Sequence, residues 1–132
     1  MITYSAELEN LGKFIQYAGN NAEQAGFAPD ELLHIELAME ECIVNIMNYA
    51  FSGKPGDITV ECSVLDNGIE ITVSDNGTPF NPLKKEDPDL TLPIEERKVG
   101  GLGIYLVKNL MDEISYSRGN GSNVLVMKKY KG

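Results

Sequence analysis

The segment from about Asp30 to Ala50 constrains the fold most, because its residue pattern predicts one long helix with two different faces. At 100° per residue, the apolar side chains gather on one side of this helix: Ile35, Met39, Cys42, Ile43 and Ile46. A stripe of His34, Glu41, Asn45 and Asn48 lies on the other side. The helix is too apolar to lie freely in solvent, so the polar stripe requires an explanation of its own.

The rest of the chain predicts two further helices and two hairpins. An amphipathic helix over about 8–22 is expected as the first element, with Gly26 as its C-cap. Strands are expected over 58–65 and 69–74 and, near the end of the chain, over 114–117 and 124–130. A third helix begins at Gly100-Gly101-Leu102-Gly103. This order predicts a single domain over 1–132, an α/β two-layer sandwich with a mostly antiparallel sheet and helices on one face.

Residues 78–99 are rich in Pro, Lys, Asp and Glu and show no sustained periodicity. A connection of this length in a compact domain is usually functional or disordered.

Charge and composition exclude several classes of function. The formal net charge of −9 argues against binding to nucleic acid or to an anionic membrane, because both require basic patches. No apolar run is long enough to cross a bilayer, and the first residues lack the features of a secretory signal. We therefore expect a cytoplasmic protein in which Cys42 and Cys62 are buried free thiols.

Glu41 and Asn45 are the first candidate site residues. Residues four positions apart on a helix lie one turn apart and can converge on one ligand. An amide oxygen is a credible ligand for Mg²⁺, and a carboxylate can orient or deprotonate a nucleophile. The same spacing also occurs on ordinary solvated helix faces, so it does not define a site alone.

Two glycine-containing motifs follow. Asp75-Asn76-Gly77 ends a strand, where it forms either a tight turn or a base-binding edge. In the second case the Asp75 carboxylate would accept a hydrogen bond from the exocyclic amine of adenine, and Gly77 would let a flat base approach the backbone. The run from Gly100 to Gly103 either reverses the chain or directs helix N-terminal amides at phosphate oxygens.

The order of these motifs resembles that of the GHKL ATPase superfamily over nearly the whole chain. Glu41 to Asn45 matches its N box, residues 75–80 its first glycine box, Gly101-Leu102-Gly103 its second, and Gly121-Ser122 its last. Within the superfamily, the bare domain and the run Gly-Gly-Leu-Gly-Ile-Tyr-Leu-Val-Lys are similar to the anti-sigma-factor serine/threonine kinases.

The resemblance implies a Bergerat-type ATP-binding fold with ATP and Mg²⁺ as cofactors. It assigns Glu41 as general base and Asn45 as magnesium ligand, with a polar contact from Asn48. It assigns Asp75 and Gly77 to adenine, and it places a lid over about 80–99. The remaining nucleotide-binding positions are Gly100, Gly101, Leu102, Gly103, Gly121 and Ser122.

The implied reaction is transfer of the ATP γ-phosphoryl group to a serine or threonine of a small STAS-type anti-sigma-factor antagonist. A sigma factor or another regulator would be the competing partner, and the kinase would be a homodimer. Two departures keep an alternative open. The N-terminal helix has Lys13 but none of the arginines that some family kinases place there, and the last glycine box reads Gly121-Ser122-Asn123. The alternative is a non-catalytic module that sequesters a regulator when ATP is bound. A histidine-kinase catalytic domain is the third hypothesis.

Overall fold

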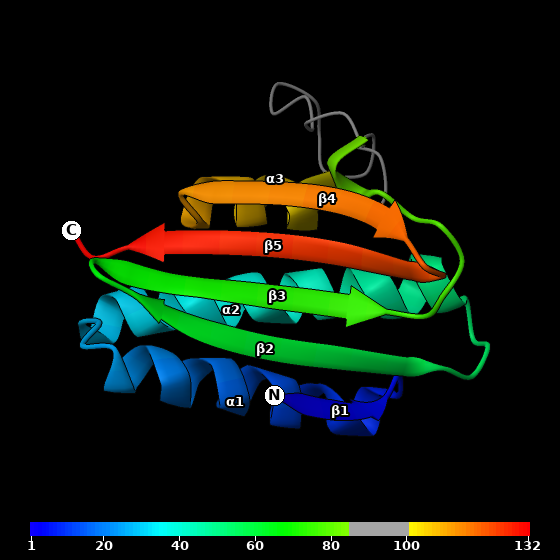
Figure 1. Cartoon of the computed structure of the whole chain (residues 1–132), viewed down its shortest axis with the longest axis horizontal. Coiled ribbons are helices and arrows are strands. Elements are labelled where there is room, and N and C mark those ends of the chain that lie inside the picture. Colours follow the sequence, from blue (N-terminus) through cyan, green and yellow to red (C-terminus); the bar gives the residue numbers. More distant parts are fainter. Residues whose placement is uncertain (85–100) are drawn as a thin grey trace.

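An antiparallel sheet with helices against one face forms the fold of the computed structural model, which describes residues 1–84 and 101–132 (Figure 1). Its strands are β1 (Ile2–Ser5), β2 (Asp57–Leu65), β3 (Gly68–Asp75), β4 (Glu113–Gly119) and β5 (Ser122–Tyr130), in the spatial order β1-β2-β3-β5-β4. The helices are α1 (Leu11–Gln24), α2 (Pro29–Ile46) and α3 (Gly101–Leu110). The predicted two-layer sandwich is confirmed.

The core lies between the sheet and the helices. Alternate residues of β3 point into it, so Ile69, Ile71 and Val73 are buried while the residues between them are partly exposed. The predicted apolar face of α2 is confirmed, since all five of its side chains are at most 3% exposed. Cys42 is buried as expected, whereas Cys62 is only half-buried.

The sequence-based order of elements was wrong at its beginning, because a strand precedes the first helix. β1 pairs antiparallel with β2, with Ile2 opposite Val60 and Ser5 opposite Asp57. A short 3-10 helix, Leu8–Asn10, then leads into α1. The Asn10 side chain donates hydrogen bonds to the carbonyl and hydroxyl oxygens of Ser5, at 3.0 and 2.9 Å, and so fixes the chain reversal.

The predicted long helix changes its geometry near its end. The α-helical part stops at Ile46, and a π-helix, Met47–Phe51, continues it to Ser52, which has a left-handed backbone with φ of 51°. Wider π-turns of this kind are frequent at functional sites. Here the turn places the Ala50 carbonyl oxygen where both the backbone amide and the hydroxyl of Thr78 donate to it, at 2.9 Å each.

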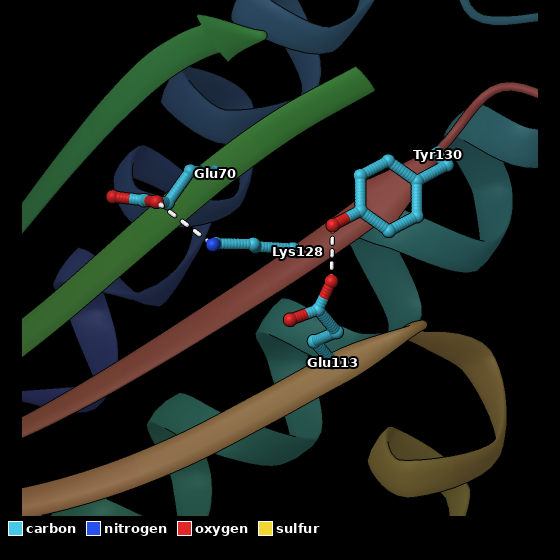
Figure 2. Close-up of polar contacts among 4 residues, drawn as sticks. All are labelled: Glu70, Glu113, Lys128 and Tyr130. Atoms are coloured by element: carbon cyan, nitrogen blue, oxygen red, sulfur yellow. Dashed lines mark hydrogen bonds and ion pairs between the residues drawn. The ribbon is translucent and has the colours of Figure 1, made fainter. Parts of the chain in front are cut away.

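The sheet face opposite the helices carries polar pairs rather than a core. Figure 2 shows Lys128 of β5 paired with Glu70 of β3 at 3.8 Å, and the Tyr130 hydroxyl donating to Glu113 of β4. A largely solvated ion pair such as Lys128–Glu70 contributes little to stability. These contacts therefore belong to the solvent face of the sheet.

Of the predicted lid over 80–99, only 80–84 lie within the described residues. They include a short 3-10 helix, Pro82–Lys84, and Phe80, whose ring stacks on Tyr49 with 5.4 Å between centroids. Residues 85–99 lie outside the described residues, so the lid stays a prediction. Within the described part of the chain, no helix combines the length and apolar character needed to span a membrane.

Candidate nucleotide-binding site

Asn45 has a buried amide oxygen without a partner. The Asn45 side chain is 5% exposed, and its Nδ2 donates to the backbone carbonyl of Glu41 at 2.9 Å, which fixes the orientation of the amide. Its Oδ1 then faces no hydrogen-bond donor among the residues that the structure describes. Leaving such an oxygen unpaired costs about 1–3 kcal/mol. An unpaired buried oxygen of this type indicates a ligand that supplies the missing contact, and a cation fits it.

The first turn of α3 packs against the same part of α2, and this contact depends on Gly103. A Cβ at position 103 would lie 2.5 Å from Oε2 of Glu41 and 3.1 Å from Nδ2 of Asn45. Glycine is therefore required for this close approach. Glu41 and Asn45, predicted to act together, are thus brought beside a glycine-rich helix start more than fifty residues away in the sequence.

The start of α3 supplies what an anionic group needs. The first backbone amides of any α-helix lack intrahelical partners, and the helix dipole favours negative charge there. Gly101, Leu102 and Gly103 form this first turn, while Gly100 lies outside the described residues. At the other end of α3, the Lys129 ammonium donates to the carbonyl of Leu110 at 2.8 Å and holds the helix on the sheet.

Asp75 lies at the end of β3 with a side chain that is only 4% exposed. Its Oδ1 accepts hydrogen bonds from the Gly77 amide and from Nδ2 of Asn123, both at 2.9 Å. No described residue donates to its Oδ2, which is left to accept a hydrogen bond from a ligand. Burial raises the pKa of Asp75, while the hydrogen bonds from Asn123 and Gly77 and the charge of Arg118 oppose that rise.

Gly77 is fixed by a close approach to the end of the long helix. A Cβ at this position would lie 2.7 Å from the Ala50 carbonyl oxygen and 2.9 Å from the Ala50 Cβ. The Gly77 carbonyl oxygen accepts a hydrogen bond from Nη1 of Arg118 at 2.9 Å. Asn76, between the two predicted site residues, has a structural role instead, because its Oδ1 accepts from the Asp57 amide at 2.9 Å.

The remaining predicted positions within the described residues are Asn48, Gly121 and Ser122. Asn48 is exposed, and its side chain has no hydrogen bond within the described structure, while its backbone carbonyl accepts from Ser52. Gly121 belongs to the turn between β4 and β5, and Ser122 is the first residue of β5. Gly121 has φ of +76° and follows Asn120 with φ of +53°, and Ser122 pairs with Gly119. The positive φ favours glycine at position 121, so Gly121 has a role in the hairpin itself.

Asn123 is the site residue for which the sequence analysis gave no role. It lies opposite Asp75 in the β3–β5 ladder and points to the helical side of the sheet, with 4% exposure. A signal was present in the sequence, since Asn123 alternates with Leu125 and Met127 and is therefore a polar residue at a core-facing position. An amide in such a position must be hydrogen-bonded.

No group of three or more His, Cys, Asp or Glu residues that could hold a metal occurs in the described ranges. A Mg²⁺ ion at this site would need few protein ligands, because this ion commonly keeps waters and takes substrate phosphates as further ligands. The unpaired Oδ1 of Asn45 fits that mode of binding.

The antiparallel sheet with helices on one face, the helix-borne Glu41–Asn45 pair, the glycine helix start beside it and the strand-end acid Asp75 are features of a histidine kinase-like ATPase domain. Residues 4–129 match the family model described as the histidine kinase-like ATPase domain, and the chain belongs to that family. The family resemblance deduced from the motifs is confirmed.

Two curated relatives are named serine-protein kinase RsbW. That of Bacillus thuringiensis is 35% identical over 111 residues, and that of Bacillus mycoides is 37% identical over the same length. Each alignment covers 81% of this chain and 69% of the relative. Among solved structures, the catalytic domain of the histidine kinase ThkA aligns with a TM-score of 0.58 and 14% identity, covering 99% of this chain and 97% of that domain. This last likeness concerns the fold alone.

Proposed function

We propose that this chain binds Mg²⁺-ATP and transfers the γ-phosphoryl group to a serine or threonine hydroxyl of a small protein. The observation that carries the proposal is the unpaired Oδ1 of Asn45, buried beside the Glu41 carboxylate and the first turn of α3. The relatives named serine-protein kinase, at 35–37% identity over most of the chain, support the choice of a protein hydroxyl as acceptor.

Each part of the site has a separate role in this reaction. Asp75 accepts a hydrogen bond from the adenine amine on its free Oδ2, beside the backbone of Gly77. The amides of Gly101, Leu102 and Gly103, preceded by Gly100, bind phosphate oxygens. Asn45 holds Mg²⁺ through Oδ1, and this ion, when bound, neutralises charge on the phosphates. Asn48, in the π-helix that follows α2, adds a polar contact to the nucleotide, and Gly121 and Ser122 hold the hairpin that carries Asn123.

Glu41 is the general base. Its carboxylate takes the proton of the acceptor hydroxyl as that oxygen forms a bond to the γ-phosphorus, while the bond to the β–γ bridging oxygen breaks and ADP leaves. Such a base typically contributes about a hundred- to ten-thousand-fold in rate. The half-buried position of Glu41 next to Gly103, in the first turn of α3, supports this assignment.

The partner follows from the resemblance to the anti-sigma-factor kinases. The acceptor is a STAS-type anti-sigma-factor antagonist, and a sigma factor or another regulator competes with it for a cytoplasmic homodimer of this chain. A phosphoserine adds a charge of about −1.5 to −2 at neutral pH. Because this protein already has a net charge of −9, phosphorylation weakens the return of the antagonist.

A second candidate function, ATP-dependent sequestration without chemistry, is favoured by one contact. Lys13 is the one basic residue of α1, and its ammonium lies over the Tyr4 ring, 4.8 Å from the centroid. Lys13 is exposed, but a cation held over a ring in this way is less available to a phosphate or a partner than a free arginine would be.

A single-turnover transfer assay distinguishes the two functions. The wild-type protein, the γ-labelled nucleotide Mg²⁺-ATP and the purified antagonist protein are mixed, and the label on the antagonist is measured beside a nucleotide-binding titration. We expect Glu41→Ala to bind nucleotide almost as tightly as wild type and to lose transfer about a hundred-fold or more. Transfer that persists in this variant contradicts the base assignment, and tight antagonist binding without any wild-type transfer supports sequestration.

A further inference from the structure

Asn123 uses the whole hydrogen-bonding capacity of its side chain at one buried position. Its Nδ2 donates to Oδ1 of Asp75 at 2.9 Å and to the Thr78 carbonyl at 2.8 Å. Its Oδ1 accepts from the Tyr116 hydroxyl at 2.6 Å and from the Phe80 amide at 3.1 Å. An asparagine side chain offers two donors and two acceptor lone pairs, so all four are occupied.

These contacts join three separate parts of the chain. Asp75 ends β3, Thr78 and Phe80 belong to the segment that follows it, and Tyr116 lies on β4 on the far side of β5. The Phe80 ring in turn stacks on Tyr49 of the π-helix. One amide therefore fixes both the acid at the strand end and the backbone on the next few residues.

We propose that Asn123 is a positioning residue for adenine recognition. It holds the Asp75 carboxylate so that Oδ1 is occupied and Oδ2 faces the base. It also fixes the backbone of Thr78 and Phe80 beside that carboxylate. The inference rests on the proposed function of Asp75 as the acceptor for the adenine amine. It gives Asn123 no direct contact with the nucleotide.

The choice of residue type follows from the donor and acceptor pattern. An aspartate at position 123 would have no donor when ionised, and would place a second negative charge against Asp75 and the Thr78 carbonyl. A threonine keeps one hydroxyl donor but cannot satisfy four partners. A leucine has a similar size to asparagine and removes every one of the four hydrogen bonds.

The positioning role predicts that adenine binding depends on pH, because Oδ2 of Asp75 is an acceptor without a proton only when the carboxylate is ionised. The groups that act on the Asp75 charge are Arg118 from β4 and the Asn123 and Gly77 donors. The Cys42 thiol of α2 also faces this charge, and its pKa is raised first by burial and then by the charge of Asp75. Burial raises the Asp75 pKa and the Asn123 donor lowers it. Adenine binding is present above this pKa and is lost as pH falls through it, so removal of the donor moves the loss to higher pH.

The experiment measures ATP and adenosine affinity by calorimetry from pH 4.5 to 8 for wild type, Asn123→Leu, Asn123→Thr and Tyr116→Phe. We expect Asn123→Leu to weaken binding of both ligands roughly tenfold or more at neutral pH and to raise the pH at which binding is half lost. Asn123→Thr, which suits a strand and keeps one donor, should show a smaller pH shift and guards against misfolding of the leucine variant. Tyr116→Phe spares both Nδ2 hydrogen bonds and should stay within about threefold of wild type.

An Asn123→Leu protein that binds ATP with wild-type affinity and an unchanged pH midpoint overturns the inference, provided that Asp75→Asn loses binding in the same assay. A weaker affinity with an unchanged midpoint in both Asn123 variants also overturns it, because a purely structural role would give that result. If Asp75→Asn itself binds ATP and adenosine as wild type does, the adenine-reading role of Asp75 fails instead.

Discussion

The backbone of Gly103 lies directly against the Glu41 carboxylate, so closely that a Cβ at position 103 would stand 2.5 Å from Oε2. The two residues come from α3 and α2, and their contact sets the proposed base beside the helix start that would hold phosphates. This close contact explains why the third residue of α3 is a glycine, because the contact leaves no space for a Cβ whatever the backbone conformation.

Gly103→Ala should therefore impair transfer much more than stability. The atom in conflict is the end of a flexible glutamate, which can rotate away at small cost, but the displaced carboxylate no longer reaches the acceptor hydroxyl. We expect a fall in single-turnover rate of up to about a hundred-fold, approaching that of a base deletion. Thermal unfolding measured on the same sample reports stability.

The matched control is Gly12→Ala, since Gly12 is also helical but has no atom within 4 Å of an added Cβ. It should gain about 0.5–1 kcal/mol from helix propensity and keep wild-type transfer. Equal transfer rates for Gly103→Ala and Gly12→Ala would contradict the role of the Gly103–Glu41 contact.

Asn45→Ala should weaken nucleotide binding only when magnesium is present. The variant removes the unpaired Oδ1 that we assign to the cation, so the gain in ATP affinity that wild type shows on addition of Mg²⁺ should largely disappear. Titrations of ATP with Mg²⁺ and with excess chelator measure this difference. A variant that retains the full magnesium-dependent gain would place the ion elsewhere.

Asp75→Asn should weaken ATP binding while it stabilises the unliganded fold. Loss of a charged acceptor costs about 1.5–3 kcal/mol, or roughly 10- to 100-fold in affinity. The folded pKa of Asp75 is raised, so its ionised form destabilises the protein at neutral pH, and this destabilisation disappears as pH falls below the unfolded value. The neutral amide avoids it and can still accept from Gly77 and Asn123 through Oδ1.

Differential scanning calorimetry at pH 7 and pH 4 checks this prediction. The melting temperature of Asp75→Asn should exceed that of wild type at pH 7, and the difference should shrink at pH 4. A lower melting temperature at pH 7 would show that the carboxylate stabilises the fold instead.

The two cysteines should resist alkylation in the folded protein. Burial raises the pKa of Cys42 to about 12 and that of Cys62 to about 11, so the reactive thiolate is scarce at pH 8. We expect no modification by iodoacetamide within an hour at pH 8, and complete modification of both in 8 M urea, as measured by intact mass. Rapid labelling of native Cys42 would contradict the packing of α2.

Local patterns were sufficient to predict the helices and hairpins, because amphipathic spacing and Asn-Gly turns act over a few residues. They were not sufficient for β1, whose four residues form a strand only through pairing with β2, more than fifty residues away. The π-helical end of α2 was equally hidden, since its geometry depends on the contact between Ala50 and Thr78.

The residues of the candidate site were likewise predictable from the sequence only where a local pattern identified them. Glu41 and Asn45 were recognisable from one helical turn, and Gly103 from its place at a helix start. Asn123 needed the strand register that sets it opposite Asp75, 48 positions earlier in the chain. A side chain with four hydrogen bonds, such as that of Asn123, cannot be deduced from sequence spacing when its partners lie in separate parts of the chain.

The position of β5 between β3 and β4 has a consequence for how the protein forms during synthesis. This strand, Ser122–Tyr130, follows all the other described strands in the sequence but is an interior one in the sheet (Figure 1). A growing chain can fold its β2–β3 hairpin early, yet β4 has no neighbour to pair with until the final strand has left the ribosome. Chains that end before β5 therefore expose unpaired strand edges, which favour aggregation.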